Sequence, residues 1–489
     1  MSGFGHPRCL EDMTDHNNTT KVVVIGGGYA GTVAANHLRV RADVDITLVN
    51  PRPKFVERIR LHQFAAGNYD PTVDYGTLLG EGVRLVVDSA TRIDTASRTV
   101  QLASGRALDY DYIIYAVGST GTTPSTVPGA TEFAHPIAEL EYAQWLRDSL
   151  DELDPDAWVT VVGAGLTGTE TAAELAEQGH KVTLVCGGRL TPSFSEPGRR
   201  SVAKWLAKLG VTVLEADVVV EVQPDSVVFA DGAVRPSALT IWTTGFGVPE
   251  LAANSGLRTD TLGGLLTDET LTSVDDERIV AAGDAAAPSG QALRMSCQAA
   301  GPLGVQAGNT VLSRIAGTKP GVIDQAFLGS SLSLGRRAAT LQWARKDDSP
   351  LNVYIGGRIG AASRRRPAKP PCGGSGAKRA SPARFSGPRA ASVPGSRCSR
   401  WSRTRDHRRP DRRLGRRRAC RAVHSVAAAV VHDRLRDPRF GNGIRRRAAG
   451  QLSALGRRGP HGSAGHQGVS GAAGDPPGAE RAARQCPQA

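Results

Sequence analysis

One pattern occurs twice in this chain: a short apolar run, three glycines at G-x-G-x-x-G spacing, and a segment of helical character. The first copy spans residues 21–38 and the second spans residues 158–177. The glycines of the two copies are Gly26, Gly28 and Gly31, followed by Gly163, Gly165 and Gly168. In such a strand–turn–helix, the first glycine allows the turn, the second lets the backbone approach a pyrophosphate, and the third lets helix and strand pack. The repeat therefore predicts an α/β protein with two Rossmann-like dinucleotide-binding domains.

A further strand follows each glycine unit, and the position after that strand bears on the nucleotide ribose. DITLV at residues 45–49 precedes Asn50, whose amide can hydrogen-bond a ribose hydroxyl, although an acidic residue is usual there. KVTLV at residues 181–185 precedes Cys186, two glycines and Arg189. Without a carboxylate at this position a 2′-phosphate is not repelled, and Arg189 can pair with it. The choice between NADH and NADPH therefore stays open.

Two acidic residues near these units have both a functional and a structural interpretation. Glu170, two positions after the last glycine of the second unit, either caps the helix start or faces the nicotinamide ribose. Asp284 ends the strand-like sequence RIVAAGD at residues 278–284 and precedes a helical segment. It either hydrogen-bonds a chain of sugar hydroxyls or caps that helix. The sequence alone does not decide between these roles.

Each of the two units ends in a further apolar run. YIIYAV at residues 112–117 ends at Gly118, and IWTTGF at residues 241–246, which contains Gly245, mirrors it in the second unit. Residues 84–102 alternate apolar and polar side chains, which predicts the strands of a small meander. One chain that holds two dinucleotides implies electron transfer between them, because a reduced nicotinamide can pass hydride to a flavin.

The net charge of +13 is unevenly distributed along the chain. Residues 362–489 carry 30 Lys and Arg against 6 Asp and Glu, whereas residues 1–361 carry 30 against 41. The tail shows no periodicity and contains no Tyr, so it is predicted to be disordered. An arginine-rich nucleic-acid-binding tail is one interpretation. We favour another, out-of-frame translation of GC-rich DNA, because the tail lacks repeated motifs and parts of it read coherently in other frames. No specific nucleic-acid partner is predicted.

The remaining composition indicates a cytoplasmic protein. No apolar run reaches the ~20 residues that span a bilayer, and residues 1–20 lack the apolar core of a secretory signal and are expected to be disordered. Of seven cysteines, only Cys9, Cys186 and Cys297 precede the tail, and they lie far apart in sequence. Such a distribution is no disulfide framework and is typical of a reducing compartment. No metal site is predicted.

Residues 21–361 resemble FAD-dependent pyridine nucleotide–disulfide oxidoreductases, and most of all type II NADH dehydrogenases and apoptosis-inducing-factor-like NAD(P)H oxidoreductases. The two glycine motifs together with RIVAAGD carry the resemblance. It implies that FAD is bound by Gly26, Gly28, Gly31 and Asp284, and NAD(P)H by Gly163, Gly165, Gly168 and Glu170. Asn50, Gly118 and Gly283 belong to the candidate FAD site, and Arg189 and Gly245 to the candidate NAD(P)H site.

The resemblance also implies an FAD domain that is split by an inserted NAD(P)H domain. The predicted parts are a first FAD segment over 21–135, an NAD(P)H domain over 136–246 and a second FAD segment over 247–320. Residues 321–361 look like a truncated C-terminal α+β segment, which breaks off where the tail begins. We therefore expect the apolar faces of residues 322–359 to lack a partner.

Two features place the chain within this superfamily. No cysteine pair follows the first glycine unit, so disulfide-reductase chemistry is excluded. SCQAAGPLG at residues 296–304 resembles the segment over the flavin in type II NADH dehydrogenases, which would put Gln298 on the acceptor side; otherwise Gln298 is a buried helix residue.

The implied activity is hydride transfer from NAD(P)H to FAD, with the electrons passing on to a quinone or another small acceptor. The resemblance admits a homodimer and peripheral contact with the inner face of a membrane. The alternative is an FAD-holding NAD(P)H-sensing or interaction protein with little turnover and a nucleic-acid-contacting tail.

Overall fold

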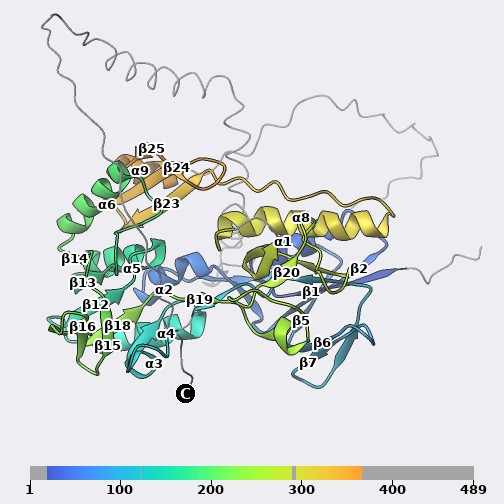
Figure 1. Cartoon of the computed structure of the whole chain (residues 1–489), viewed down its shortest axis with the longest axis horizontal. Helices are drawn as coiled ribbons and strands as arrows, with labels where there is room; N and C mark the ends of the chain where they lie inside the picture. The colour runs from blue at the N-terminus through green and yellow to red at the C-terminus, as the bar shows by residue number, and fades with distance from the viewer. Residues whose placement is uncertain (1–18, 122, 289–292, 366–489) are drawn as a thin grey trace, which may run out of the picture. The chain divides into compact units, whose positions relative to one another are not determined.

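The computed structural model describes residues 19–121, 123–288 and 293–365, drawn as coloured ribbons in Figure 1. Residues 1–18 and 366–489 lie outside the described residues. The predicted disorder is wrong at its inner limits, because Thr20 begins the strand β1 (Thr20–Ile25) and residues 362–365 end the helix α9 (Gly357–Arg365). For the other terminal residues the disorder, and the interpretation of the tail as out-of-frame sequence, stay predictions.

Five parallel strands form the first sheet, in the order β21-β9-β1-β2-β5. They are β1 (Thr20–Ile25), β2 (Val44–Asn50), β5 (Val83–Val87), β9 (Tyr112–Tyr115) and β21 (Ile279–Ala281). The central strands are apolar because both faces of a parallel sheet are covered. The meander predicted over residues 84–102 is wrong at its start, because β5 joins this parallel sheet and pairs Leu85 with Leu48.

Two helices, α1 (Tyr29–Leu38) and α8 (Cys297–Ile315), lie side by side against the first sheet (Figure 1). Their close approach depends on glycines of α8. A Cβ at Gly304 would lie 2.4 Å from the carbonyl oxygen of Ala30, and one at Gly308 would lie 2.9 Å from the His37 ring. Because these glycines let the two helices approach so closely, the start of α8 is held close to the start of α1.

The second sheet repeats this arrangement with parallel strands in the order β11-β18-β12-β13-β14. They are β11 (Ala134–Pro136), β12 (Trp158–Val162), β13 (Lys181–Val185), β14 (Thr212–Leu214) and β18 (Leu239–Trp242), with helices α4 (Leu140–Asp151), α5 (Leu166–Glu177) and α6 (Glu196–Lys208). All five strands fall between β9 and β21 in sequence, so the second unit is inserted within the first. The α/β class with two Rossmann-like units is confirmed, and the residue boundaries between the domains stay predictions.

Short elements join and cover the two sheets. An antiparallel ribbon of β10 (Thr120–Gly121) and β19 (Phe246–Gly247) pairs the segment that leaves the first unit with the segment that returns to it. The other small sheets are β3 (Lys54–Val56) with β4 (Thr72–Asp74), β6 (Ala90–Asp94) with β7 (Thr99–Leu102) and β8 (Ala107–Asp109), β15 (Val219–Val222) with β16 (Ser226–Phe229) and β17 (Val234–Pro236), and β20 (Leu265–Thr267) with β22 (Ala286–Pro288). The short helices are η1 (Arg58–Arg60), α2 (Leu61–Ala65), η2 (Tyr75–Thr77), α3 (Ala130–Phe133), α7 (Leu251–Asn254) and η3 (Gly283–Ala285).

The C-terminal segment is an antiparallel sheet of β23 (Gly329–Leu334), β24 (Ala338–Ala344) and β25 (Pro350–Ile355), followed by α9 (Gly357–Arg365). One face of it packs on α5 and α6, where Leu332 and Leu334 are only 0% and 1% exposed. The expectation that this segment lacks a partner is therefore wrong for that face, because the inserted unit covers it. The apolar side chains that do remain exposed are Val322, Val353, Tyr354 and Ile359.

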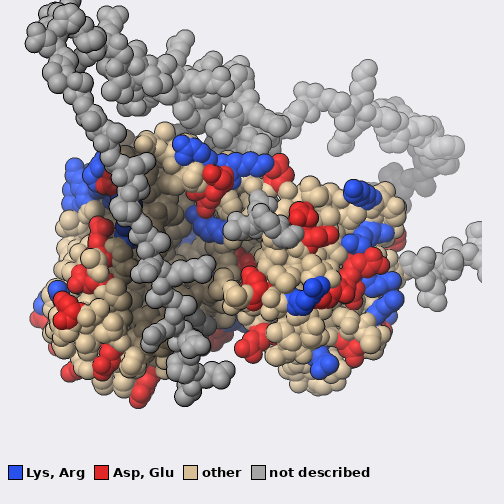
Figure 2. Space-filling view, in the orientation of Figure 1, with Lys and Arg blue, Asp and Glu red and all other residues tan. Residues whose placement is uncertain are grey.

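Acidic and basic side chains are interspersed over the face of the described residues in Figure 2. None of the helices in the described ranges combines the length and the apolar character that crossing a bilayer requires. Within the same ranges, no group of three or more His, Cys, Asp and Glu side chains could hold a metal ion.

We expect His135 on β11 to make the stability of the protein depend on pH. Its ring stacks on Trp145 with centroids 3.8 Å apart, and its Nε2 lies 3.1 Å from the Ser149 hydroxyl. Burial lowers the pKa of His135, so the folded state prefers the neutral ring. The stability it contributes is present above the unfolded pKa of about 6.5 and is lost as the pH falls below that value. We expect His135→Phe, which keeps the aromatic stack, to weaken the fall in unfolding free energy between pH 7 and pH 5.

Chemical denaturation at several pH values measures this effect. Around pH 8 the His135 ring is neutral in both the folded and the unfolded protein. The unfolding free energies of His135→Phe and the unaltered protein should therefore differ there by an amount that does not change with pH. An identical pH dependence of the two proteins would show that His135 does not titrate against folding.

Candidate functional site

The first glycine turn joins β1 to α1 and leaves the start of the helix open. Gly26 has a φ of 100°, and a Cβ there would lie 2.2 Å from the carbonyl oxygen of Ala116. A Cβ at Gly31 would lie 1.9 Å from the carbonyl oxygen of Gly26, so only glycine lets the helix pack here. At Gly28, by contrast, a Cβ would meet no atom within 4 Å. Gly28 is also the N-cap of α1 and no side chain caps the helix, so its first N–H groups are available to an anion.

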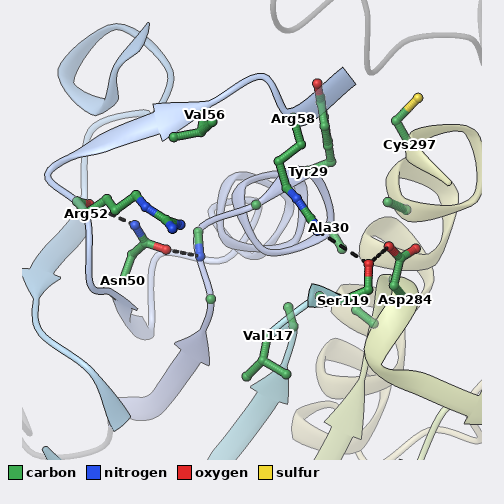
Figure 3. A pocket seen from close by; sticks show the side chains of 18 of the residues that line it. Tyr29, Ala30, Asn50, Arg52, Val56, Arg58, Val117, Ser119, Asp284 and Cys297 are labelled. Atoms are coloured by element: carbon green, nitrogen blue, oxygen red, sulfur yellow. Dashed lines mark hydrogen bonds between the residues drawn. The ribbon is translucent and has the colours of Figure 1, made fainter. Parts of the chain in front are cut away.

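A cavity that is partly open to solvent lies in front of this turn (Figure 3). Six of the seven residues predicted for FAD line it, namely Gly26, Gly28, Asn50, Gly118, Gly283 and Asp284. The seventh, Gly31, lies behind the turn in contact with Gly26. The structure brings these residues together because they follow the carboxyl ends of parallel strands, which meet at one edge of the sheet.

Asn50 holds the glycine turn in place. Its Oδ1 accepts a hydrogen bond from Gly27 N at 2.9 Å, and its Nδ2 donates to the Arg52 carbonyl at 2.8 Å. Tyr75 donates its hydroxyl to the Gly27 carbonyl at 2.6 Å, so both the N–H and the carbonyl of Gly27 are held by side chains. An amide has two N–H groups and two lone pairs, so one of each remains on Asn50 for a ribose hydroxyl.

Three basic residues that line the cavity were not singled out from the sequence: Arg52, Lys54 and Arg58. The guanidinium groups of Arg52 and Arg58 lie 3.0 and 3.4 Å from the Glu139 carboxylate. Arg52 also hydrogen-bonds Glu141 and thereby lowers the pKa of that carboxyl group. The arginine-rich run at residues 51–60 was the only signal, and it does not tell which cations face a cavity. Whereas Arg52 and Arg58 share these carboxylates, Lys54 forms no ion pair with any described residue, and its charge beside an open helix N-terminus favours an anionic ligand.

Asp284 lies across the cavity from Asn50 (Figure 3). Its Oδ2 accepts from the Ser119 hydroxyl at 2.7 Å, and its Oδ1 accepts from Ser296 N at 3.0 Å. Ser296, not Asp284, is the N-cap of α8, since its hydroxyl accepts from Ala299 N. The helix-cap interpretation of Asp284 is therefore wrong. The carboxylate instead joins the ends of β9 and β21 to the start of α8, with lone pairs left for sugar hydroxyls.

Tyr29 and Cys297 line the same cavity (Figure 3). The Tyr29 hydroxyl is buried and has no hydrogen-bond partner among the described residues. Burial, and then the charges of Cys297 and Glu57, raise its pKa, so it remains a donor. Cys297 is a free thiol, and burial raises its pKa as well. An orphaned donor in the wall, cations near the turn and empty space at Gly28 together fit a dinucleotide such as FAD.

The second glycine turn has the same geometry as the first. Gly163 has a φ of 104°, and a Cβ there would lie 2.2 Å from Thr244 Cγ2. A Cβ at Gly168 would lie 1.8 Å from the carbonyl oxygen of Gly163. Gly165 is again the uncapped N-cap, here of α5, with no atom within 4 Å of a Cβ built on it. A second pyrophosphate therefore fits this turn.

Glu170 lies in the second turn of α5 and does not cap that helix, so the helix-cap interpretation is wrong. Its Oε1 accepts from Ser333 N of β23 at 2.6 Å, and its Oε2 lies 3.9 Å from His62 Nε2. Its charge also contributes to the raised pKa of Cys297, which lines the first cavity. Glu170 thus brings a carboxylate of the second unit close to the wall of the first cavity.

Arg189 and Gly245 lie near the carboxyl ends of other strands of the second sheet. Arg189 is exposed in the loop after β13, and the same loop returns to the second glycine turn, where Thr191 N donates to the Ala164 carbonyl at 2.9 Å. Gly245 has a φ of 81° and precedes β19, as Gly118 with a φ of 73° precedes β10. Both glycines turn the chain from a central strand into the linking ribbon.

Gln298 does not line the cavity that holds the predicted FAD residues. It is half-buried on the first turn of α8, and its Oε1 accepts from Arg294 Nη2 at 3.3 Å. Arg294 in turn donates to the Ser330 hydroxyl of β23 at 2.7 Å and pairs with Asp348 at 3.1 Å. Gln298 therefore lies where the start of α8 meets the C-terminal sheet.

A known protein family matches the part of the chain that contains both glycine turns. The family described as pyridine nucleotide-disulphide oxidoreductase matches residues 20–304. A NADH dehydrogenase-like protein of Mycobacterium tuberculosis is 30% identical over 367 residues, covering 67% of this chain and 89% of that protein. A type II NADH:quinone oxidoreductase of Haemophilus influenzae is 26% identical over 325 residues, covering 54% of this chain and 73% of the relative.

Two solved structures share the fold. The sulfide:quinone oxidoreductase of Aquifex aeolicus superposes with a TM-score of 0.60 at 19% identity, over 71% of this chain and 89% of that one. NDH2 of Plasmodium falciparum in complex with NADH superposes with a TM-score of 0.61 at 16% identity, over 71% and 93%.

Proposed function

Because the chain belongs to the pyridine nucleotide-disulphide oxidoreductase family, we propose that it is an FAD-dependent NAD(P)H dehydrogenase that passes electrons to a quinone or another small acceptor. The family makes it an oxidoreductase with FAD and NAD(P)H as cofactors. Support for a quinone acceptor comes from relatives that are named NADH:quinone oxidoreductases.

The observation that carries the proposal is the pair of open glycine turns, each beside an uncapped helix start. Gly28 and Gly165 each leave empty space beside an uncapped helix N-terminus, where a pyrophosphate oxygen can reach backbone N–H groups. Glu170 follows the second turn, and its charge reaches Cys297 in the wall of the first cavity. Two dinucleotides bound this way would approach each other near Glu170.

FAD bound in the first cavity would supply a hydride acceptor that can release electrons one or two at a time. The chain's own residues bind and orient it. N–H groups of α1 and the side chains of Arg52 and Lys54 would hold the pyrophosphate, and Asn50 a ribose hydroxyl. Asp284, kept in position by Ser119, would accept hydrogen bonds from the sugar hydroxyls that lead toward Cys297.

We place the acceptor on the side of α8 that carries Gln298. Arg294 donates a hydrogen bond to Gln298 Oε1. The Nε2 amide of Gln298 is thereby left to donate a hydrogen bond to an oxygen of the electron acceptor. The Arg294 pair with Asp348 and its bond to Ser330 hold the amide in this orientation. We assign no role in electron transfer to Cys186 or Cys297. Burial raises the pKa of both thiols, that of Cys186 to about 12, and so disfavours the reactive thiolate.

Spectroscopy of the full-length protein tests the proposal. We expect a bound flavin spectrum that NADH bleaches under anaerobic conditions and that NAD⁺ leaves unchanged. A soluble quinone should restore the oxidised spectrum faster than dissolved oxygen does. Protein that carries no flavin, or flavin that neither NADH nor NADPH reduces, would contradict the proposed function.

A further inference from the structure

We propose that Glu215 makes the second site selective for NADH over NADPH, by supplying from a neighbouring strand the carboxylate that position 186 lacks. The inference rests on the proposed function and names the coenzyme and the residue that selects it. The sequence left the choice between NADH and NADPH open, because Arg189 can pair with a 2′-phosphate. Glu215 shifts that choice toward NADH.

The two units show where this carboxylate is missing. Gly26 N donates to the Val49 carbonyl at 2.8 Å, and Gly163 N donates to the Val185 carbonyl at 2.8 Å. Asn50 and Cys186, which follow these two carbonyls, are therefore equivalent positions. The residue at this position contacts the ribose in dinucleotide-binding folds, and an acidic side chain there both binds the 2′-hydroxyl and repels a 2′-phosphate. A cysteine thiol does neither.

The end of β14 lies beside this position. Cys186 N donates to the Leu214 carbonyl at 2.8 Å, Gly188 N to the Glu215 carbonyl at 2.6 Å, and Gly187 N to the Asp217 carbonyl at 3.1 Å. The segment 215–217 is thus fixed along the loop that follows β13. The side chain of Glu215 turns over the same loop, with its Oε2 3.5 Å from Leu190 N. The carboxylate therefore lies on the loop where the ribose of a coenzyme bound to Gly165 is expected.

The charge around this loop favours a ribose that carries no 2′-phosphate. Besides burial, the charges of Glu215 and Asp217 raise the pKa of the Cys186 thiol, so both carboxylates are electrostatically close to it. Neither carboxylate forms an ion pair with any described residue. In the first unit the acidic residue after the corresponding strand, Asp88, is neutralised by Arg106 at 3.3 Å. Residues 186–190 and 215–217 together carry one cation, Arg189, and these two carboxylates.

Glu215→Gln tests the proposal because it removes the charge and keeps the size and polarity of the side chain. Because NADH and NADPH would reduce the flavin, dissociation constants are measured on the oxidised holoenzyme with redox-inactive analogues of the two coenzymes, by fluorescence titration or calorimetry. We expect the unaltered protein to prefer NADH, and Glu215→Gln to narrow that preference about five- to tenfold, mainly through tighter NADPH binding. In turnover, the KM ratio should change while kcat with saturating NADH stays the same.

Two further variants make the result specific. Glu152→Gln removes an exposed carboxylate after α4, at the amino edge of the same sheet, and should leave the preference unchanged. Adding Cys186→Glu to Glu215→Gln should restore the preference for NADH. An unaltered protein that prefers NADPH, or an unchanged ratio in Glu215→Gln, would overturn the inference and leave the proposed function standing. Binding of neither coenzyme to the unaltered protein would overturn both.

Discussion

Gly28→Val is expected to leave the fold intact and to remove FAD from the protein. The backbone at Gly28 is extended, with φ of −73° and ψ of −164°, and a Cβ there meets no protein atom within 4 Å. Valine therefore fits the apoprotein without strain. Its side chain fills the space through which a pyrophosphate must approach the N–H groups of α1. Loss of one or two charge-assisted hydrogen bonds would weaken binding by about 3 kcal/mol, or roughly a hundredfold.

The flavin-to-protein ratio after purification measures this effect, and circular dichroism with thermal unfolding reports on the fold. Gly165→Val is the matched control, because it places the same side chain in the second turn. It should retain FAD and lose NAD(P)H binding. Gly31→Ala provides the contrast, because its Cβ would lie 1.9 Å from the Gly26 carbonyl and should destabilise the protein itself. Recovery of Gly28→Val with a full complement of FAD would disprove the assignment of the first turn.

A chain that ends after Leu328 is expected to unfold at a much lower temperature than the full chain, or to be insoluble. It loses β23 to α9, including Leu332 and Leu334, which are almost fully buried against the second unit. Their removal exposes the apolar side chains of the second unit on which they pack. Each side chain exposed in this way lowers the free energy of unfolding by roughly 1.5–3 kcal/mol. It also removes Arg336, whose guanidinium lies 3.0 Å from Glu174, a side chain only 1% exposed. A buried carboxylate without its cation is strongly destabilising.

A chain that ends after Arg365 should match the full chain in unfolding temperature and in the rate of NAD(P)H oxidation, because it keeps every described element. Leu334→Ala and Val353→Ala refine the comparison within the C-terminal sheet. The first should cost about 2–5 kcal/mol and the second almost nothing, since Val353 is 52% exposed. Equal unfolding temperatures for the chain ending at Leu328 and the full chain would show that the C-terminal sheet does not stabilise the second unit.

The sequence by itself was sufficient for the two Rossmann-like units, the family and its cofactors. These features depend on short, local patterns. An apolar strand, a glycine turn and a helix start lie within about ten residues, and the steric demands at Gly26, Gly31, Gly163 and Gly168 admit glycine alone. The grouping of Gly118, Gly283 and Asp284 with Gly28 also followed, because the residues after parallel strands meet at one edge of a sheet.

Only the tertiary structure decided what the charged residues contact. Asp284 bonds Ser119, Glu170 bonds Ser333, and Glu215 lies on the loop after β13, through pairs that are 25 to 165 positions apart in the chain. The same holds for β5, which looked like a meander strand, and for the inner face of the C-terminal sheet, which looked uncovered. A local pattern fixes which faces of an element are apolar or charged. Which distant element lies against that face depends on how the whole chain packs, and no short stretch of sequence contains that information.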